Sequence, residues 1–149
     1  MIQEQIILEQ KRVMPVVGVI FDGKKILLTK RYAPDTAYSH NKWQFVGGGI
    51  EFGEHPRETL HREVKEEIGI EIELLSTHPV IISHVFETAN THALVIAYPA
   101  KYLGGTIDFS NDDETSDAKW FRYDEIDFAN SLPKTKEIID ETRKRFNIE

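Results

Sequence analysis

Three consecutive glycines, Gly47 to Gly49, stand between a short apolar run and a segment with the periodicity of a helix. Glycine lets a backbone turn sharply or approach another group closely. In the segment that follows, apolar side chains recur at every fourth position and form one stripe of a helix: they are Leu60, Val64 and Ile68. Pro56 is favoured in a first helical turn and Gly69 after a last one. The sequence therefore predicts a sharp turn followed by a helix from about Pro56 to Gly69.

Three carboxylates share the neighbouring side of this predicted helix: Glu63, Glu66 and Glu67. Like charges three or four residues apart on a helix repel each other by about 0.2–0.5 kcal/mol per pair. A chain that tolerates this repulsion is expected to hold something positive there, and a hard divalent cation such as Mg²⁺ takes oxygen ligands. The alternative is a solvated acidic face on a surface helix.

The same segment resembles the signature of the Nudix hydrolase family, G-x5-E-x7-R-E-U-x-E-E-x-G-U with U aliphatic. Every specified position agrees: Gly48, Glu54, Arg62, Glu63, Val64, Glu66, Glu67, Gly69 and Ile70. With each residue type used at roughly 5–7%, such a match arises by chance at a given start with a probability on the order of 10⁻⁹. The resemblance, which is to MutT-like members, therefore favours a cation site over a solvated face.

The resemblance covers roughly residues 14–146 and implies an α-β-α sandwich with a mixed sheet between helices, so residues 1–149 are expected to form a single domain. It also implies hydrolysis of a nucleoside diphosphate linked to another moiety, with Mg²⁺ as cofactor or Mn²⁺ as a substitute. By similarity, Glu63, Glu66 and Glu67 are the metal ligands, with the Gly47 carbonyl as a further ligand.

Arg62 precedes Glu63 and lies four residues before Glu66, so its guanidinium is placed to brace a carboxylate through a forked hydrogen bond. Glu54 lies just before the first helical turn, where the helix dipole favours a negative charge. Two readings of Glu54 stay open: a helix cap, or a residue that reaches a second metal.

A further acid arrives from a loop in several members of the family. In this sequence Glu114 is the first candidate, with Asp112 and Asp113 as rivals, and an ordinary acidic loop is the alternative. The general base is either Glu63 or Glu114. The candidate substrate-binding residues are Arg31, Gly48, Glu54, Phe86 and Thr135.

Substrate preference is judged from features found in particular members of the family. Val85, Phe86 and Thr88 stand where ADP-ribose or dinucleoside polyphosphate members carry a proline or a tyrosine. Thr135 lacks the paired donor and acceptor of the asparagine that reads an oxidised guanine. The leading hypothesis is a (d)NTP or modified-nucleotide pyrophosphohydrolase. The alternatives are hydrolysis of a nucleotide sugar or related diphosphate, and a catalytically silent nucleotide sensor.

Several strands are predicted around the glycine-rich segment. Runs 16–21 and 26–31 flank Asp22-Gly23, a hairpin signal. Further strands are expected at 43–46, 70–75, 80–87, 92–98 and 118–122. The unbroken apolar run Ala93 to Ala97 is typical of a strand buried on both faces. A helix is expected over 134–146, with Ile138, Ile139, Thr142 and Phe146 on its inner side. Residues 2–13 are ambiguous, with an edge strand as one reading.

Composition limits the partners and the location. The net charge of −7 argues against a nucleic-acid-binding surface, which carries a basic patch, so a small-molecule nucleotide is the expected partner. Met1 to Gln5 lacks a secretory signal, and no apolar run approaches the ~20 residues that span a bilayer. These features predict a cytoplasmic protein without a membrane partner. The absence of cysteine excludes disulfides and a thiolate nucleophile. An exposed first strand that pairs two subunits into a homodimer is a further hypothesis.

Overall fold

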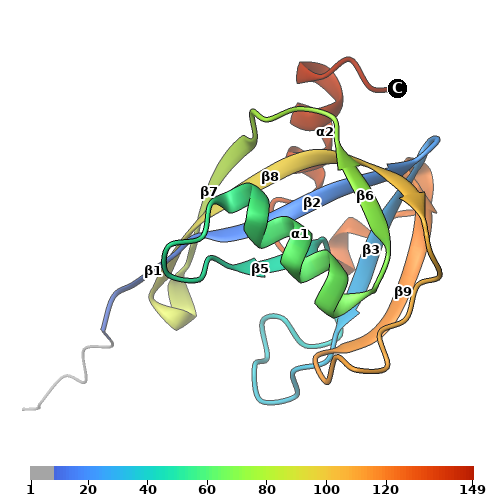
Figure 1. Cartoon of the computed structure of the whole chain (residues 1–149). Helices are drawn as coiled ribbons and strands as arrows, with labels where there is room; N and C mark the ends of the chain where they lie inside the picture. Colours follow the sequence, from blue (N-terminus) through green and yellow to red (C-terminus); the bar gives the residue numbers. More distant parts are fainter. Residues whose placement is uncertain (1–8) are drawn as a thin grey trace, which may run out of the picture.

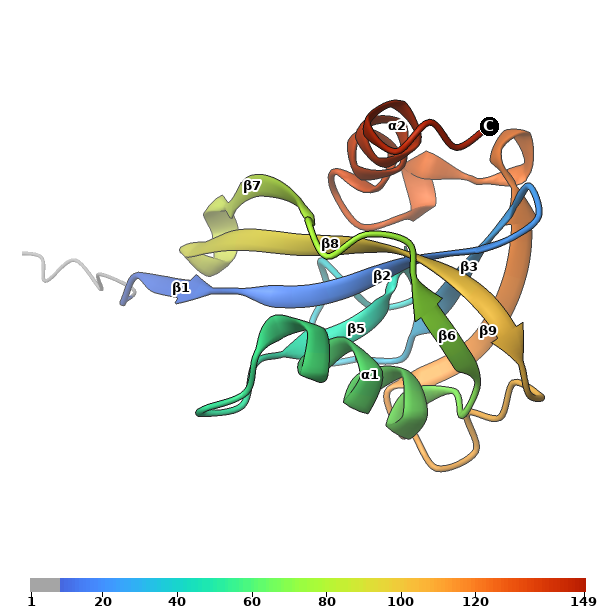
Figure 2. The same cartoon turned by 45° about the horizontal axis from the view of Figure 1, so that its top comes forward.

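The computed structural model describes residues 9–149 and shows one mixed sheet between two helices (Figures 1 and 2). The helices are α1 (Pro56–Glu67) and α2 (Thr135–Arg145), with short 3₁₀ turns η1 (Glu87–Ala89), η2 (Tyr123–Glu125) and η3 (Phe128–Asn130). The strands are β1 (Lys11–Val13), β2 (Pro15–Asp22), β3 (Lys25–Arg31), β4 (Trp43–Gln44), β5 (Val46–Gly49), β6 (Glu71–Leu74), β7 (Val80–Phe86), β8 (Thr91–Gly104) and β9 (Thr115–Arg122). The predicted α-β-α sandwich is confirmed.

Strands β2 and β8 form the centre of the sheet and run parallel, from Val16 beside Ile96 to Phe21 beside Lys101. β2 also pairs with β3 and β5, both antiparallel. The predicted hairpin is present, because Asp22 pairs with Lys25 and Gly23 adopts a positive φ of 60°. β6 and β7 pair with the other edge of β8, and β9 pairs with β3.

Side chains that alternate along β2 and β3 feed two separate cores. The face toward α1 contributes Val16, Ile20 and Leu27, which pack with Leu60, Val64 and Ile68 of the helix. The face toward α2 contributes Val19, Phe21, Ile26 and Leu28, which pack with Ile138 and Ile139. Each fully buried Leu, Ile or Val contributes about 1.5–3 kcal/mol relative to an exposed one. The apolar stripe predicted for the first helix is thus what fixes α1 on the sheet.

The glycine run does not form the sharp turn predicted from the sequence. The expected strand 43–46 divides into β4 and β5, and β5 includes the glycines, which pair with Val17, Val16 and Pro15 of β2. Glycine is needed here for close approach rather than for a turn, because β5 lies directly against β2 and α1. The turn follows later, where Gly53 has a φ of 84°.

The expectation of a strand buried on both faces at 92–98 is wrong. β8 is longer than predicted, and the side chain of Leu94 within it is 40% exposed. Its neighbours on that face, Ile81 and Val85 of β7, are exposed as well, whereas the opposite face of β7 packs against α2. Residues 1–8 lie outside the described residues, and they include residues 2–8 of the ambiguous segment 2–13. In the part of the chain that the structure describes, neither helix is long and apolar enough to cross a membrane.

Candidate active site

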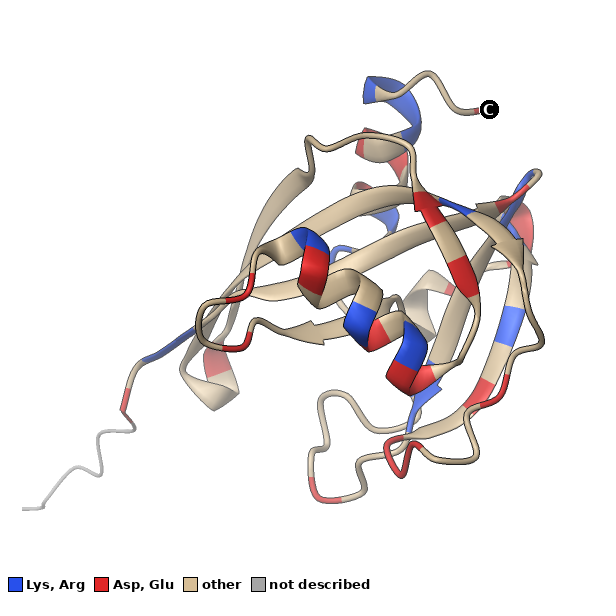
Figure 3. Ribbon diagram, viewed as in Figure 1, with Lys and Arg blue, Asp and Glu red and all other residues tan. Residues whose placement is uncertain are grey.

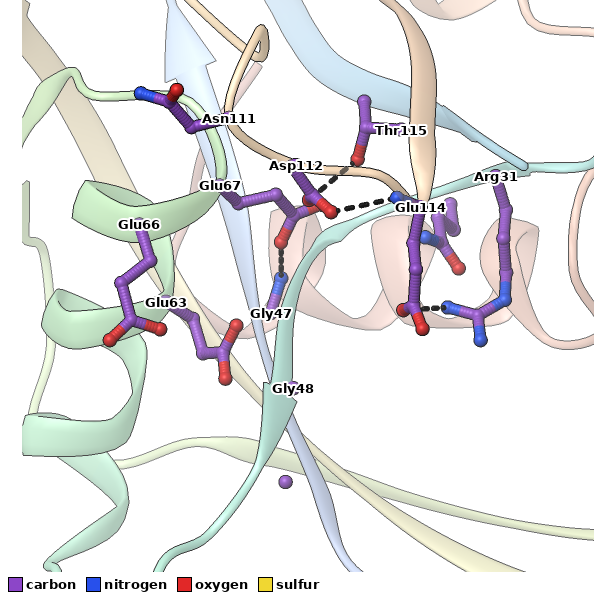
Figure 4. A pocket seen from close by; sticks show the side chains of 12 residues that line it. Arg31, Gly47, Gly48, Glu63, Glu66, Glu67, Asn111, Asp112, Glu114 and Thr115 are labelled. Atoms are coloured by element: carbon purple, nitrogen blue, oxygen red, sulfur yellow. Dashed lines mark hydrogen bonds and ion pairs between the residues drawn. The ribbon is translucent and has the colours of Figure 1, made fainter. Parts of the chain in front are cut away.

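A cavity of about 480 Å³ lies between α1, β5 and the loop that precedes β9. Its lining is Arg31, Gln44, Gly47, Gly48, Gly49, Glu63, Glu66, Glu67, Asn111, Asp112, Glu114 and Thr115. Figure 4 shows carboxylates from α1 and from the loop pointing toward the same space. Figure 3 shows acidic residues on both α1 and this loop, and the lining holds five acidic side chains against one basic one, Arg31, so the cavity walls are predominantly negative.

Two of the three glycines leave room for the site. A Cβ atom on Gly48 would lie 2.5 Å from Glu63 Oε1 and 2.6 Å from Glu63 Cδ, so any side chain would displace that carboxylate. A Cβ atom on Gly47 would overlap the carbonyl oxygen of Val16 and lie 2.7 Å from Val17 Cα. Gly49 has nothing within 4 Å of such an atom. The absent side chains of Gly47 and Gly48 therefore let β5 lie against both β2 and the acidic face of α1.

Glu67 is buried, with 6% of its surface exposed, and both of its hydrogen-bond donors are neutral. Thr29 Oγ1 donates to Oε1 and the Gly47 backbone N–H donates to Oε2, each at 3.3 Å. Burial and then the nearby charge of Asp112 raise the pKa of Glu67 to about 8. Within residues 9–149 no Lys, Arg or His forms an ion pair with this carboxylate, so its charge is under-compensated, which is the condition that a bound cation would relieve.

Arg62 is the centre of the hydrogen-bond network on the acidic helix face. Its Nη1 donates to Glu63 Oε1 at 2.9 Å and to Glu66 Oε2 at 3.2 Å. Its forked pair of hydrogen bonds goes to Glu54, and Nη2 also reaches the Gly49 carbonyl at 3.1 Å. Burial raises the pKa of Glu63, while the hydrogen bond from Arg62 opposes that rise. Arg62 thus holds three of the carboxylates in place.

Glu54 is not the cap of α1. His55 is the N-cap: its Nδ1 accepts from the Arg57 N–H, and the Glu58 carboxylate accepts from the His55 N–H. The Glu54 carboxylate accepts from Arg62, from Thr59 Oγ1 at 2.7 Å and from the Glu51 N–H at 3.1 Å. These bonds, led by the one from Arg62, lower the pKa of Glu54 to about 2. Glu54 does not line the cavity, so its role as a substrate-binding residue finds no support in the geometry.

The acidic loop presents two different carboxylates to the cavity. Asp112 lies beside Glu67 (Figure 4), and its negative charge raises the pKa of both Glu67 and Glu63. Glu114 is paired with Arg31, with 3.4 Å between its Oε2 and Nη1 of Arg31. Asp113 is not part of the lining. The loop acid nearest the buried glutamate is therefore Asp112, whereas the sequence pointed first to Glu114.

The remaining candidates divide by location. Arg31 and Gly48 line the cavity, but Phe86 and Thr135 do not. Thr135 is buried, and its hydroxyl donates to the Leu132 carbonyl at 2.6 Å, so it is not available to a substrate there. The Phe86 ring instead contacts the rings of Tyr38 and His84, with centroids 4.9 and 4.7 Å apart.

Sequence reasoning missed three polar side chains of the lining: Gln44, Asn111 and Thr115. For Gln44, the position between Trp43 and Phe45 on a strand was a usable signal, because alternate side chains point to opposite faces. Thr29 was missed for a similar reason, since it lies within an apolar strand where its hydroxyl has to find a partner.

No three Asp, Glu or His side chains within residues 9–149 are already assembled around one point in a way that would hold a cation. The hydrogen bonds of Arg62 explain this, because they draw Glu63 and Glu66 toward the guanidinium. The oxygen donors nevertheless suit a hard cation, and the space that Gly48 leaves for Glu63 is consistent with a built site.

The model of the NUDIX domain family matches residues 11–142. This chain belongs to the NUDIX family. A NUDIX hydrolase of known structure from Nitrosomonas europaea superposes with a TM-score of 0.79 at 24% identity and covers 91% of this chain and 90% of its own, which shows the shared fold.

Two curated relatives are similar in sequence to this NUDIX chain. An RNA pyrophosphohydrolase of Acinetobacter baylyi is 44% identical over 71 residues, 46% of this chain and 37% of that protein. The NAD-capped RNA hydrolase NudC of Mannheimia succiniciproducens is 34% identical over 112 residues, 74% of this chain and 39% of that protein. The matches thus span about two fifths of the length of these relatives.

Proposed function

We propose that this NUDIX chain hydrolyses the pyrophosphate linkage of a nucleoside diphosphate linked to another moiety, with Mg²⁺ as cofactor. The proposed substrate is a (d)NTP or a modified nucleotide. One observation carries the proposal: Glu67, a buried glutamate that has no positive partner among the described residues, shares one cavity wall with Glu63 and Glu66. All three belong to the family signature, and the signature is complete in this chain.

Glu63, Glu66 and Glu67 would hold the metal, with the Gly47 carbonyl as a proposed further ligand. Bound Mg²⁺ would neutralise charge on the phosphate oxygens and lower the pKa of a water molecule. The chain itself then has two tasks. Arg62 keeps the carboxylates oriented: its Nη1 bonds to one oxygen each of Glu63 and Glu66, so that the other oxygen of each would face the metal, while its forked pair stays on Glu54. Arg31 would present its guanidinium to a substrate phosphate across the cavity, because a guanidinium can donate to two phosphate oxygens at once.

The choice of a small nucleotide rests on size and charge. A cavity of about 480 Å³ fits within the range of small-molecule sites. A polyanion such as RNA would meet the acidic side chains of the lining and a chain of net charge −7, and both disfavour a phosphate backbone.

Hydrolysis at an RNA 5′ end is a second candidate, because the two curated relatives are named for RNA substrates. A 5′ end presents the same chemistry as a nucleoside triphosphate at the cavity. The two candidates therefore differ in whether the chain of nucleotides beyond the first one adds affinity. A nucleotide sugar is a third substrate class with the same diphosphate group.

The test is a panel of substrates with products resolved by ion-exchange chromatography. Modified and ordinary dNTPs, nucleotide sugars, ADP-ribose, dinucleotides and short 5′-triphosphorylated RNAs are compared with Mg²⁺ and with EDTA. We expect the highest kcat/KM for a mononucleotide and loss of turnover in EDTA. A kcat/KM that rises with RNA length would replace the small-nucleotide proposal with the RNA one.

Glu67→Gln links activity to the site, and Glu73→Gln on β6, an exposed glutamate of the same type, is the matched control. We expect Glu67→Gln to lower kcat by at least ~10²-fold, as removal of charge stabilisation does elsewhere, and Glu73→Gln to leave it unchanged. Ligand-dependent thermal stabilisation without turnover across the whole panel would instead show a nucleotide sensor.

A further inference from the structure

β7 forms an open edge of the sheet. Within residues 9–149 it pairs with β8 alone, from Val80 beside Ala97 to Phe86 beside Thr91, and no other strand pairs with its outer side. Figures 1 and 2 both show it at the outer margin of the sheet. Half of its backbone N–H and C=O groups therefore face outward, where another strand can pair with them.

The sequence of β7 lacks the features that normally protect an edge. The strand reads VIISHVF, without Lys, Arg, Asp, Glu, Pro or Gly. β6 lies along the same side of β8 and carries two exposed glutamates, Glu71 and Glu73. Charged side chains on edge strands prevent pairing with other chains. The same sheet margin is thus protected at β6 and unprotected at β7.

The side chains of β7 are also self-complementary. An antiparallel pair of two β7 strands centred on Ser83 uses the whole strand and places Ile81 of one copy opposite Val85 of the other. Both of these apolar side chains are exposed in one copy, at 60% and 52%. The two-fold axis repeats the contact, so each copy covers the exposed apolar residues of its partner.

Charges at the two ends of β7 match in the same register. Pro79 of one copy lies opposite Glu87 of the other. Arg145 Nη1 donates to the Pro79 carbonyl at 3.3 Å, and the same guanidinium is paired with Glu141 of its own chain at 3.0 Å. Glu87 follows directly after the other end. The axis therefore brings an acid toward a guanidinium at both ends, while the pairing strands themselves contain no Lys, Arg, Asp or Glu.

We infer that two copies of this chain associate through antiparallel pairing of their β7 strands about a two-fold axis at Ser83. The first strand is a poorer candidate for the predicted homodimer, because β1 has only three residues and two of them are Lys11 and Arg12. The interface lies outside the cavity residues, so the inference does not depend on the proposed reaction.

Charge substitutions at the axis test this arrangement. Ser83 is exposed and bonded to His92 Nε2 at 2.6 Å, so a change there does not disturb the core. We expect sedimentation equilibrium to show a dimer for the wild type and monomers for Ser83→Lys and for Ser83→Glu alone. An equimolar mixture of the two variants restores a dimer, because only this register places residue 83 opposite itself. Ser83→Ala, which loses the bond without adding charge, stays dimeric, and Leu103→Lys on β8 is the control for an added surface charge.

A covalent test uses the absence of cysteine from the chain. Oxidation of Ser83→Cys joins two thiols into one disulfide across the axis, with an added disulfide such as oxidised glutathione as the electron acceptor, and should give a covalent dimer at low protein concentration. Leu103→Cys, which is exposed but distant from the axis, should stay monomeric on a non-reducing gel. A monomeric wild type at its highest soluble concentration, or a dimer that both Ser83 charge variants leave intact, would overturn the inference. Circular dichroism confirms that each variant is folded.

Discussion

Arg62 binds both oxygens of Glu54, with its Nε 2.8 Å from Oε2 and its Nη2 3.1 Å from Oε1. This fork fixes the plane of the guanidinium and leaves Nη1 to serve Glu63 and Glu66. The pair explains why two residues of the signature that do not line the cavity matter for its shape. Glu54 orients Arg62, and Arg62 orients the proposed metal ligands.

Arg62→Lys should therefore weaken metal binding more than it weakens the fold. A lysine keeps the charge but cannot form the fork, so the proposed ligands lose their orientation. We expect Mg²⁺ affinity to fall by about 10–100-fold, the usual effect of losing a residue that orients metal ligands, as measured by calorimetry. Arg57→Lys, also on α1, is the control and should bind Mg²⁺ as the wild type does. Equal losses in both variants would contradict the special role of Arg62.

The stability of the metal-free protein should fall as pH rises. The pKa of Glu67 in the folded state is about 8, against an ordinary value of 4.5, so its ionisation opposes folding. The contribution of protonated Glu67 to the free energy of unfolding is fully present below about pH 4.5, and it is lost as pH rises through 8. At about 1.4 kcal/mol per pKa unit, the loss is on the order of a few kcal/mol. Urea unfolding in EDTA between pH 5 and 8 measures it.

Glu67→Gln serves as the reference for that experiment, because an amide does not titrate. Its stability should change less between pH 5 and 8 than that of the wild type, and it should be the more stable protein at pH 8. Identical pH profiles for the two proteins would show that Glu67 ionises freely in the folded state.

Uptake of Mg²⁺ should release a proton at neutral pH. At pH 7 the Glu67 carboxyl, with its pKa near 8, is mostly protonated, and a metal ligand has to be deprotonated. Calorimetry in two buffers of different ionisation enthalpy should give two different binding heats. Their difference should correspond to the release of nearly one proton for each Mg²⁺ bound. The apparent affinity should rise between pH 6 and 8. In Glu67→Gln this proton release should disappear even if some binding remains.

The two loop acids should have separable effects. Asp112→Asn removes a charge beside Glu67, so the pKa of Glu67 should fall and Mg²⁺ should bind more weakly. Glu114→Gln frees Arg31 from an exposed ion pair, in which the Glu114 side chain is 67% exposed. Such a pair contributes about 0.2–1 kcal/mol, so KM should change by less than about 5-fold and Mg²⁺ affinity should not change. The reverse pattern would restore Glu114 as the additional metal ligand.

Local patterns predicted much of this molecule. The stripe of Leu60, Val64 and Ile68, together with the signals at Pro56 and Gly69, located α1 and its buried face. The helical spacing and the family signature predicted that Glu63, Glu66 and Glu67 lie together on one side of this helix. That residues 1–149 form a single domain stays a prediction.

What the sequence did not reveal depends on contacts between distant segments. The approach of β5 to β2 turned a predicted glycine turn into a strand, and Leu94 is exposed on a face of β8 that was predicted to be buried. Asp112 and Glu114 are two residues apart, and only the fold decides which of them faces Glu67. Thr135 lies outside the cavity lining, and its hydroxyl donates to the Leu132 carbonyl, a contact that the sequence pattern did not indicate.

The three consecutive glycines, Gly47 to Gly49, are not equally constrained by the atoms around them. A saturation library across positions 47 to 49 should recover few viable replacements at the first position, where the neighbouring strand leaves no space, and few at the second, where a glutamate fills it. The third position opens to empty surroundings and can accept many residues. In the evolution of this chain, the glycine at position 49 should therefore be replaced by other residues before those at positions 47 and 48.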